Sequence, residues 1–377
     1  MKPLFFIVFI IVSLNASDID VLSPIKQNII ELEKQQSSEK ERVNQYDWLS
    51  DITLNTSVIK DQNNNTTDDY SLTISQDIFK FGGIRSQIQY AKELKKMELL
   101  DIDVNTKEDL NTLFSTLIDI KLNDISLKQN LLNLKSSMIE VKHKTSEYKQ
   151  GQLDISDLNN AIMAKNEYKD AAKGLKLTRL TNINTIKKYT TKSIEALSIP
   201  DIKLISKAFY LKQALSIQYA KATTKVNDAL YKIKKSDYMP RLSVDAKMGY
   251  SEGDAYHYYG LSLNLPLSYS ASNDIQHSRL EYLISQQKLN EEKRNAIIDY
   301  DSVILNIKNY HERIRLAQED INLYQALLKT TQEEYEAGYK TIDDVQMLKN
   351  SMEIRKLDIQ TYQLNIKKQL LSLYFKI

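Results

Sequence analysis

Two long stretches of this sequence contain neither glycine nor proline. They are residues 84–149 and 274–337, and the whole chain of 377 residues has only 8 Gly and 5 Pro. Because these two residue types interrupt helices and form turns, stretches without them favour uninterrupted helices. A helix of about 62 residues, at 1.5 Å per residue, is roughly 93 Å long and exceeds an ordinary globular domain. The sequence therefore predicts two very long helices.

Apolar residues recur every seven positions within the second stretch. Two such series are present: Ile307, Ile314, Ile321 and Leu328, and Val303, Tyr310, Ala317 and Tyr324. A sustained seven-residue repeat keeps one helix face apolar and imposes left-handed supercoiling against partner helices. We therefore expect the long helices to pack as coiled coils.

A similar turn follows each long stretch. Residues 148–164 read YKQGQLDISDLNNAIMA, and residues 335–351 read YEAGYKTIDDVQMLKNS. Both begin Tyr-x-x-Gly, and an apolar residue and an acid follow at the same offsets. Glycine readily adopts the left-handed backbone that ends a helix, so Gly151 and Gly338 are expected to end the long helices. A shorter helix after each turn would complete two antiparallel hairpins.

A different pattern precedes each long stretch, because apolar and polar residues alternate there. The alternation covers four segments, at residues 48–59, 70–78, 242–250 and 259–265. A period of two predicts strands with one apolar and one polar face, and polar connections join them into hairpins at 48–78 and 241–267. Segments of about ten residues with this pattern are typical of transmembrane strands in outer-membrane barrels.

Four strands in one chain leave two sheet edges unpaired, and an open edge invites another strand. Closed membrane barrels begin at about eight strands, so this chain has to associate with copies of itself to close one. Two chains would supply eight strands and three would supply twelve, and the pattern does not choose between them. A soluble sandwich on a coiled-coil stem is the alternative for these strands.

These patterns together predict a mainly α protein with a small β part, built as two repeats. The first repeat spans 17–189 and the second spans 205–377, with 190–204 as the linker. Each repeat contains a helix, a strand hairpin, a long helix and a shorter helix. Residues 1–16, MKPLFFIVFIIVSLNA, have the apolar core of a signal peptide. An N-terminal membrane anchor is the alternative for that segment.

The composition excludes several classes of function. The 51 basic and 49 acidic residues nearly cancel, which leaves no electrostatic footprint for nucleic acid. The absence of cysteine excludes disulfides, thiolate metal sites and a lipid-modified N-terminal cysteine. The 4 histidines show no metal-ligand spacing, and the sequence has no phosphate-binding loop or catalytic triad. We therefore expect no metal, no other cofactor and no enzymatic activity.

The doubled order of elements, with matching spacing, resembles the TolC-type outer-membrane efflux proteins. Three segments carry the resemblance: SLTISQDIFKFGGIRSQIQYAK (71–92), SDYMPRLSVDAKMGYS (236–251) and YEAGYKTIDDV (335–345). The resemblance implies a homotrimer, with a twelve-stranded barrel in the outer-membrane lipid of a Gram-negative bacterium and a helical tunnel in the periplasm. It also implies an exit duct for tripartite efflux or type I secretion. The partners would be a periplasmic adaptor protein and an inner-membrane transporter.

In that family, bonds between the two hairpin tips close the periplasmic end of the tunnel. The resemblance assigns this gate to Ser156, Asp157, Tyr335, Lys340 and Asp344. The first two follow the first turn, the next two lie at the second turn, and the last matches an acid of the entrance ring. The family has arginine where Lys340 stands, and Met347 stands at the second acid of the ring, which leaves the cation selectivity of the entrance open. Adaptor contacts fall on the turns themselves, at Tyr148, Gly151 and Gly338.

The two acids that follow the turns also have a purely structural interpretation. Asp154-Ile-Ser-Asp157 and Thr341-Ile-Asp-Asp344 have the cap-then-acid spacing that begins a helix. An acid in the first turn interacts favourably with the helix dipole, so Asp157 and Asp344 could serve their own helices. The two roles are compatible, because a capping carboxylate still presents an outer oxygen.

Aromatic residues gather at the ends of the predicted strands. Those around the fourth strand are Tyr256, Tyr258, Tyr259 and Tyr269, and those at the first strand are Tyr46 and Trp48. Aromatics in such positions suit the interfacial belt of a membrane barrel. For the chain as a whole, two alternatives to a channel are a periplasmic adaptor, which also carries a long hairpin, and a soluble coiled-coil structural protein.

Overall fold

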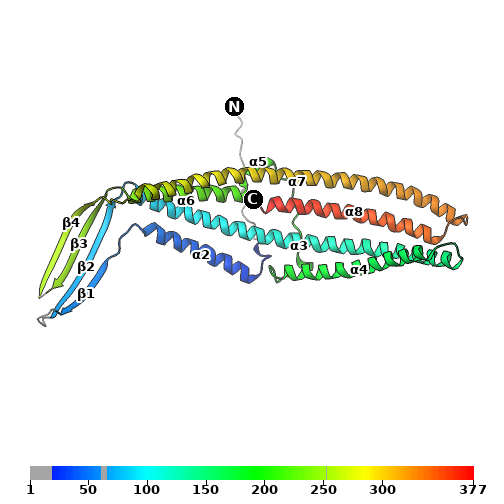
Figure 1. Cartoon of the computed structure of the whole chain (residues 1–377), viewed down its shortest axis with the longest axis horizontal. Helices are drawn as coiled ribbons and strands as arrows, with labels where there is room; N and C mark the ends of the chain where they lie inside the picture. Colours follow the sequence, from blue (N-terminus) through cyan, green and yellow to red (C-terminus); the bar gives the residue numbers. More distant parts are fainter. Residues whose placement is uncertain (1–18, 61–65, 252) are drawn as a thin grey trace, which may run out of the picture. The chain divides into compact units, whose positions relative to one another are not determined.

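The computed structural model describes residues 19–60, 66–251 and 253–377 (Figure 1). The predicted signal peptide lies outside these residues. The helices are α2 (Pro24–Tyr46), α3 (Gly83–Lys149), α4 (Ile155–Ile186), the 3-10 helix η1 (Ile194–Ala196), α5 (Lys207–Gln213), α6 (Leu215–Asp237), α7 (Ala271–Glu336) and α8 (Ile342–Tyr374). The strands are β1 (Thr53–Lys60), β2 (Thr66–Phe79), β3 (Arg241–Ser251) and β4 (Asp254–Asn264). The protein is mainly helical with a small β part, as the sequence predicts.

The two longest helices contain 67 residues in α3 and 66 residues in α7. Each continues without interruption through one of the two stretches that lack glycine and proline, which confirms the prediction of two very long helices. The chain enters α3 directly after Gly82, whose φ of 83° lies in the left-handed region that favours glycine.

The four strands form one antiparallel sheet in the order β1-β2-β3-β4. Successive cross-strand rows alternate in character. One row contains Leu54, Leu72 and Met248, and the next contains Thr53, Thr73 and Lys247. The sheet therefore has one apolar and one polar face, as the alternation predicts. Within the described protomer, β1 and β4 each have only one neighbouring strand.

The first strand begins five residues later than the alternation predicts, at Thr53 instead of Trp48. The side chain of Gln76 explains the difference, because it binds the backbone that precedes β1. Its amide nitrogen donates to the carbonyl of Trp48 at 3.1 Å, and its amide oxygen accepts from the N–H of Ser50 at 2.9 Å. These bonds replace ladder bonds in that segment, so Trp48 lies in a turn between α2 and the strand.

Two of the tyrosines predicted for the aromatic belt lie on the other face of the sheet. Tyr256 pairs with Gly249, and Tyr258 lies two residues before Gly260 on the same polar face. A Cβ atom on Gly260 would lie 2.3 Å from the Tyr258 hydroxyl oxygen, and one on Gly249 would lie 2.7 Å from the Tyr256 ring. The two glycines therefore make room for rings that lie across the polar face. Both tyrosines therefore lie on the face of β4 opposite to that of Tyr259, Leu261 and Leu263.

The described chain divides into two compact units. The first contains residues up to Asn28, Thr106–Tyr210 and Ile298–Ile377, and the second contains Ile29–Asn105 and Leu211–Ile297. Each unit takes segments from both predicted repeats. The division of the sequence into 17–189, 190–204 and 205–377 therefore remains a prediction about repeats and does not describe the compact units.

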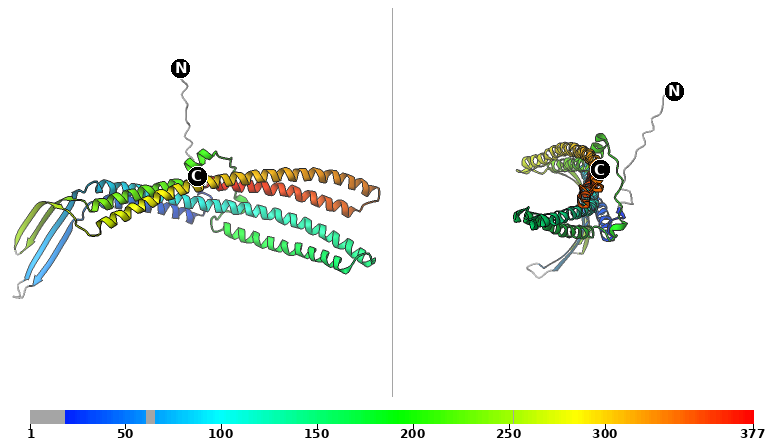
Figure 2. Two further views of the ribbon diagram at one scale, coloured as in Figure 1. Left: turned by 45° about the horizontal axis from the view of Figure 1, so that its top comes forward. Right: turned by 90° about the vertical axis from the view of Figure 1, so that its right-hand side faces the viewer.

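In the first unit, helix segments lie in the order α4, α3, α8, α7 (Figure 2). One ion pair marks each contact: Arg179–Asp124 between α4 and α3 at 2.8 Å, Lys368–Asp119 between α3 and α8 at 2.6 Å, and Arg355–Asp320 between α8 and α7 at 3.1 Å. On α7, every position of the two heptad series is buried or half-buried, and most positions between them are exposed. This distribution confirms the predicted coiled-coil packing.

The second unit contains the sheet and the helix segments that adjoin it. Ion pairs join α2 to α3, with Lys40 bound to Glu98 at 2.5 Å and Lys95 bound to Glu41 at 2.7 Å. No helix in the described part of the chain combines the length and the apolar character that crossing a membrane requires.

Candidate functional site at the hairpin tips

Both hairpin turns have the same backbone geometry. Gly151 has a φ of +70° and Gly338 has a φ of +85°. At the first turn, the N–H groups of Gly151 and Gln152 donate to the carbonyls of Tyr148 and Glu147, each at 3.0 Å. At the second turn, Gly338 and Tyr339 donate in the same way to Tyr335 and Glu334, at 3.0 and 2.8 Å. This pattern is the Schellman motif, which satisfies the last carbonyls of a helix through a glycine in the left-handed region.

The helix after the first turn is capped by one acid. Asp154 is the N-cap of α4, and its carboxylate accepts from the Ser156 N–H at 2.8 Å and from the Ser156 hydroxyl at 2.7 Å. These two bonds hold the pKa of Asp154 below its usual value. Asp157 lies in the first turn of α4, but no bond from it to the cap is present.

The helix after the second turn has a complete capping box. The Thr341 hydroxyl accepts from the Asp344 N–H at 3.2 Å, and the Asp344 Oδ2 atom accepts from the Thr341 N–H at 2.9 Å. The backbone bond from Thr341 is the main reason that the pKa of Asp344 is lowered. The predicted capping role is therefore complete for Asp344, whereas the first turn uses Asp154 and Ser156 instead of Asp157.

The proposed gate residues of the two tips do not bond to one another within one protomer. Among the described residues, no hydrogen bond or ion pair joins Tyr335 or Lys340 to Ser156 or Asp157. Tyr335 is exposed, and Ser156 is already bound to its own N-cap. Lys340 acts on Asp344 only as a nearby charge that helps to lower its pKa.

A different acid joins the two hairpins near their tips. Asp343, on the first turn of α8, accepts from Lys142 Nζ at 2.8 Å and contacts His143 Nε2 at 3.1 Å, both on α3. Its side chain is only 20% exposed. The bond from Lys142, followed by that from His143, lowers the pKa of Asp343. No local sequence pattern predicts this cluster, because Asp343 and His143 are 200 residues apart along the chain.

The groups available at the tips are exposed apolar side chains, helix caps and an ion pair between the hairpins. Tyr339, Ile155 and Ile342 are exposed around the turns. In the described part of the chain, no three histidine or acidic side chains converge as ligands of a metal ion. The tips therefore offer apolar contacts, caps and one charged bridge between the hairpins, which suit binding and gating.

Comparison with known proteins finds a matching family model for the second half of the chain and solved structures of the same fold. Residues 205–376 match the model described as "Outer membrane efflux protein". The fold matches the outer membrane protein VceC from Vibrio cholerae, with a TM-score of 0.74, 14% identity and coverage of 94% of both chains. No curated protein sequence matches at a significant level.

Two solved outer-membrane channels also have this fold. The CmeC channel of Campylobacter jejuni matches with a TM-score of 0.70 and 12% identity, over 94% of this chain and 84% of that one. The open state of the MtrE channel of Neisseria gonorrhoeae matches with a TM-score of 0.72 and 12% identity, over 96% and 88%. The family model covers less than half of the chain, and the likeness to these solved channels shows that the chain has their fold.

Proposed function

We propose that this chain is the exit duct of a tripartite efflux system, with a periplasmic adaptor and an inner-membrane transporter as its partners. In this proposal three protomers complete one barrel in the membrane and one helical tunnel in the periplasm. One observation carries it: a single chain supplies both a four-stranded sheet with two open edges and two long hairpins. A periplasmic adaptor or a coiled-coil structural protein would leave the open sheet without a role. Efflux is preferred to protein secretion because the matching family model describes efflux.

The gate of this duct, in our proposal, forms between neighbouring protomers. Tyr335 and Lys340 of one protomer would bind Ser156 and Asp157 of the next. Two features support this arrangement. Tyr335 and Lys340 have no polar side-chain partner among the described residues of their own protomer, and all four residues are exposed at the tips. The oxygen of Asp344 that lies outside its capping box would then face the entrance.

The proposed adaptor contacts lie on the turns at Tyr148, Gly151 and Gly338. Exposed apolar side chains surround these turns, and Tyr339 is 83% exposed. Aromatic side chains of this kind are common anchors in protein interfaces. The turns would therefore bind the adaptor, while the gate residues beside them respond to its docking.

The gate is tested by removing its polar groups and measuring ion flow. The double variant Tyr335→Phe with Lys340→Ser should raise the conductance of purified channels in planar bilayers. Each charge-assisted hydrogen bond contributes about 1.5–3 kcal/mol, so losing one or two per protomer should leave the tip open more often. The matched control is Tyr339→Phe with Lys329→Ser, which alters the same residue types outside the gate. A double variant with the conductance of the unmodified channel would refute the gate assignment.

A further inference from the structure

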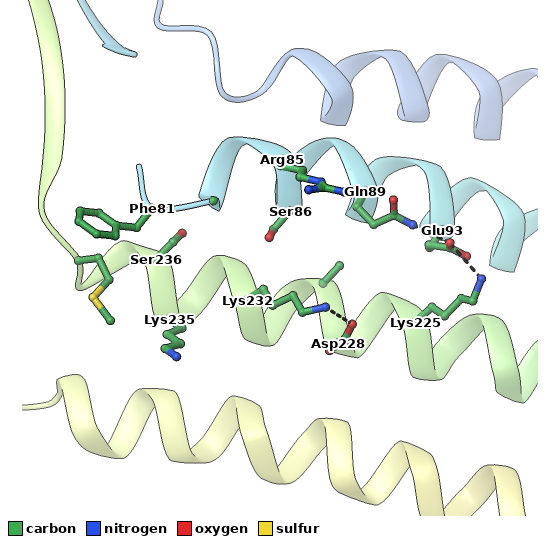
Figure 3. Close-up of a pocket in the computed structure, with 13 residues that line it drawn as sticks. Phe81, Arg85, Ser86, Gln89, Glu93, Lys225, Asp228, Lys232, Lys235 and Ser236 are labelled. Atoms are coloured by element: carbon green, nitrogen blue, oxygen red, sulfur yellow. Dashed lines mark hydrogen bonds and ion pairs between the residues drawn. The ribbon is translucent and has the colours of Figure 1, made fainter. Parts of the chain in front are cut away.

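A charged cavity of about 730 Å³ lies between the first turns of α3 and the last turns of α6, next to the strands (Figure 3). It belongs entirely to the unit that contains the sheet. None of the gate residues lines it. Gly83 allows the two helices to approach closely at the strand end, since a Cβ there would lie 2.3 Å from the Ser236 hydroxyl oxygen.

The lining of this cavity changes from apolar to charged with distance from the sheet. Phe81 and Met239 lie at the end nearest the strands, because β2 ends at Phe79 and β3 begins at Arg241. The next turn of the helices carries the polar and basic groups: Arg85, Ser86, Lys235 and Ser236. Lys232, Asp228, Glu93 and Lys225 follow farther along the helices (Figure 3). An amphipathic molecule at the membrane boundary would meet the same order of environments.

Two basic side chains in the part of the cavity nearest the sheet have no acidic partner in the part of the chain that the structure describes. Lys232 is paired with Asp228 at 2.6 Å, and Lys225 is paired with Glu93 at 3.3 Å. Neither Arg85 nor Lys235 has a carboxylate partner among the described residues. The first turn of α3 also carries no acidic residue, so the positive end of this helix dipole is not compensated by an acid of its own. Each of these cations, and the helix end, would attract an anion that enters the cavity.

The far end of the cavity contains a buried oxygen without a partner. Glu93 is only 9% exposed, and its Oε1 atom accepts from Gln89 at 2.7 Å and from Lys225. Its Oε2 atom is buried and has no hydrogen-bond partner. A buried acceptor in this state costs free energy unless a donor reaches it. A ligand that carries a hydroxyl group beyond its anionic group would supply that donor.

We propose that this cavity binds the glycerol phosphate headgroup of an anionic phospholipid from the periplasmic leaflet of the outer membrane. The phosphate would bind Arg85, Lys235 and the Ser86 hydroxyl, the acyl end would contact Phe81 and Met239, and a headgroup hydroxyl would donate toward Glu93. The membrane is the source of the ligand because the cavity begins where the strands end. This inference rests on the proposed function, in which the sheet lies in the outer membrane, and is independent of the gate.

The test counts lipids bound to purified trimers by native mass spectrometry. Trimers in mild detergent are titrated with phosphatidylglycerol or with phosphatidylcholine, which lacks both the net negative charge and the hydroxyl donors. The unmodified channel should retain phosphatidylglycerol preferentially. The variant R85Q/K235Q should bind it about 30-fold more weakly, given the usual contribution of a basic residue near an anionic membrane surface. The matched control K169Q/K173Q removes two exposed lysines of α4 and should bind as the unmodified channel does.

Three outcomes would overturn the proposal. Equal retention of the two lipids by the unmodified channel would overturn the proposal. This result needs no variant, so it can be obtained even if R85Q/K235Q fails to assemble. An equal loss of binding in the control variant would show a general charge effect. Displacement of the lipid by free glycerol 3-phosphate at similar concentrations would show a site for a soluble phosphate ester instead of a lipid.

Discussion

The two hairpins of this protein use their helices in opposite ways. In the first hairpin, the long helix α3 lies inside the protomer, between α4 and α8, and the shorter α4 lies at an edge. In the second hairpin, the shorter α8 lies inside, between α3 and α7, and the long α7 lies at the other edge. The long helix precedes the shorter helix in both hairpins, but the long helix is the inner one in the first hairpin and the outer one in the second.

Burial follows position in the protomer and not helix length. The fully buried side chains of the inner helices include Leu110, Leu113, Phe114, Leu117 and Ile118 on α3, and Leu371 and Leu373 on α8. The edge helices instead expose leucines and a methionine: Leu305, Leu316 and Leu323 on α7, and Met163, Leu177 and Leu180 on α4. A closed ring of identical chains brings unlike edges together. In the proposed ring, α7 of one protomer would therefore pack beside α4 of the next.

The largest expected effect on stability comes from removing a buried side chain of an inner helix. Phe114 is 2% exposed and stacks on Phe375 with ring centroids 5.8 Å apart. Phe114→Ala should lower the free energy of unfolding by about 3–5 kcal/mol, because it removes a buried ring and leaves a cavity. Thermal unfolding followed by the helical circular dichroism signal would measure it.

The edge variant Leu316→Ala is the matched control for this first prediction. It should change the unfolding of the helices little and should weaken the trimer on mild-detergent gels instead. If Leu316→Ala destabilised the helices as much as Phe114→Ala, the distinction between inner and edge helices would fail.

A smaller and equal effect is expected at the two turns. Gly151 and Gly338 both have positive φ, and nothing lies within 4 Å of a Cβ at either position. Alanine should therefore cost about 1–2 kcal/mol at each turn through backbone strain alone. Asparagine, which tolerates the left-handed region better, should cost less at both positions. Unequal losses in thermal unfolding for the two alanine variants would mean that one turn makes contacts beyond its backbone.

Removal of the first-turn acid should destabilise the second tip more than the first tip. Asp344→Ala removes half of the capping box and should cost about 1 kcal/mol of helix stability. Asp157→Ala should change stability by less than about 0.5 kcal/mol, because Asp154 and Ser156 form the first cap without it. Hydrogen exchange of the first turns of α8 and α4 would measure both changes. Equal protection losses would show that Asp157 also caps its helix.

The smallest effect concerns the charged bridge between the hairpins. Since Lys142 and His143 lower the pKa of Asp343, its bonds stabilise the fold above the ordinary carboxyl value of about 3.9 and are lost as the pH falls through the depressed value. We expect the hairpin ends to loosen only below about pH 4, as seen by hydrogen exchange. Asp343→Asn should remove this acid step and Asp157→Ala should keep it. Loosening at a higher pH, where Asp343 is ionised, would contradict this prediction.

The tips show how far local sequence can predict the candidate site. The Tyr-x-x-Gly turns and the box of Thr341 with Asp344 depend on residues within one or two helical turns, so both could be predicted. The bridge from Asp343 to Lys142 and His143 could not, because no local spacing relates residues on different hairpins. The bonds proposed for Tyr335 and Lys340 belong to the assembled channel, which the contacts of one protomer do not contain.

The sequence by itself determined the elements that repeat along the chain. The lack of glycine and proline determined the long helices, the seven-residue period determined the buried face of α7, and the two-residue period determined the strands. Only the tertiary structure decided which helices lie inside, where β1 begins and which face carries Tyr256 and Tyr258. The physical reason is that period and propensity act between near neighbours, whereas register, packing order and the binding of Gln76 to the segment before β1 join residues far apart in sequence.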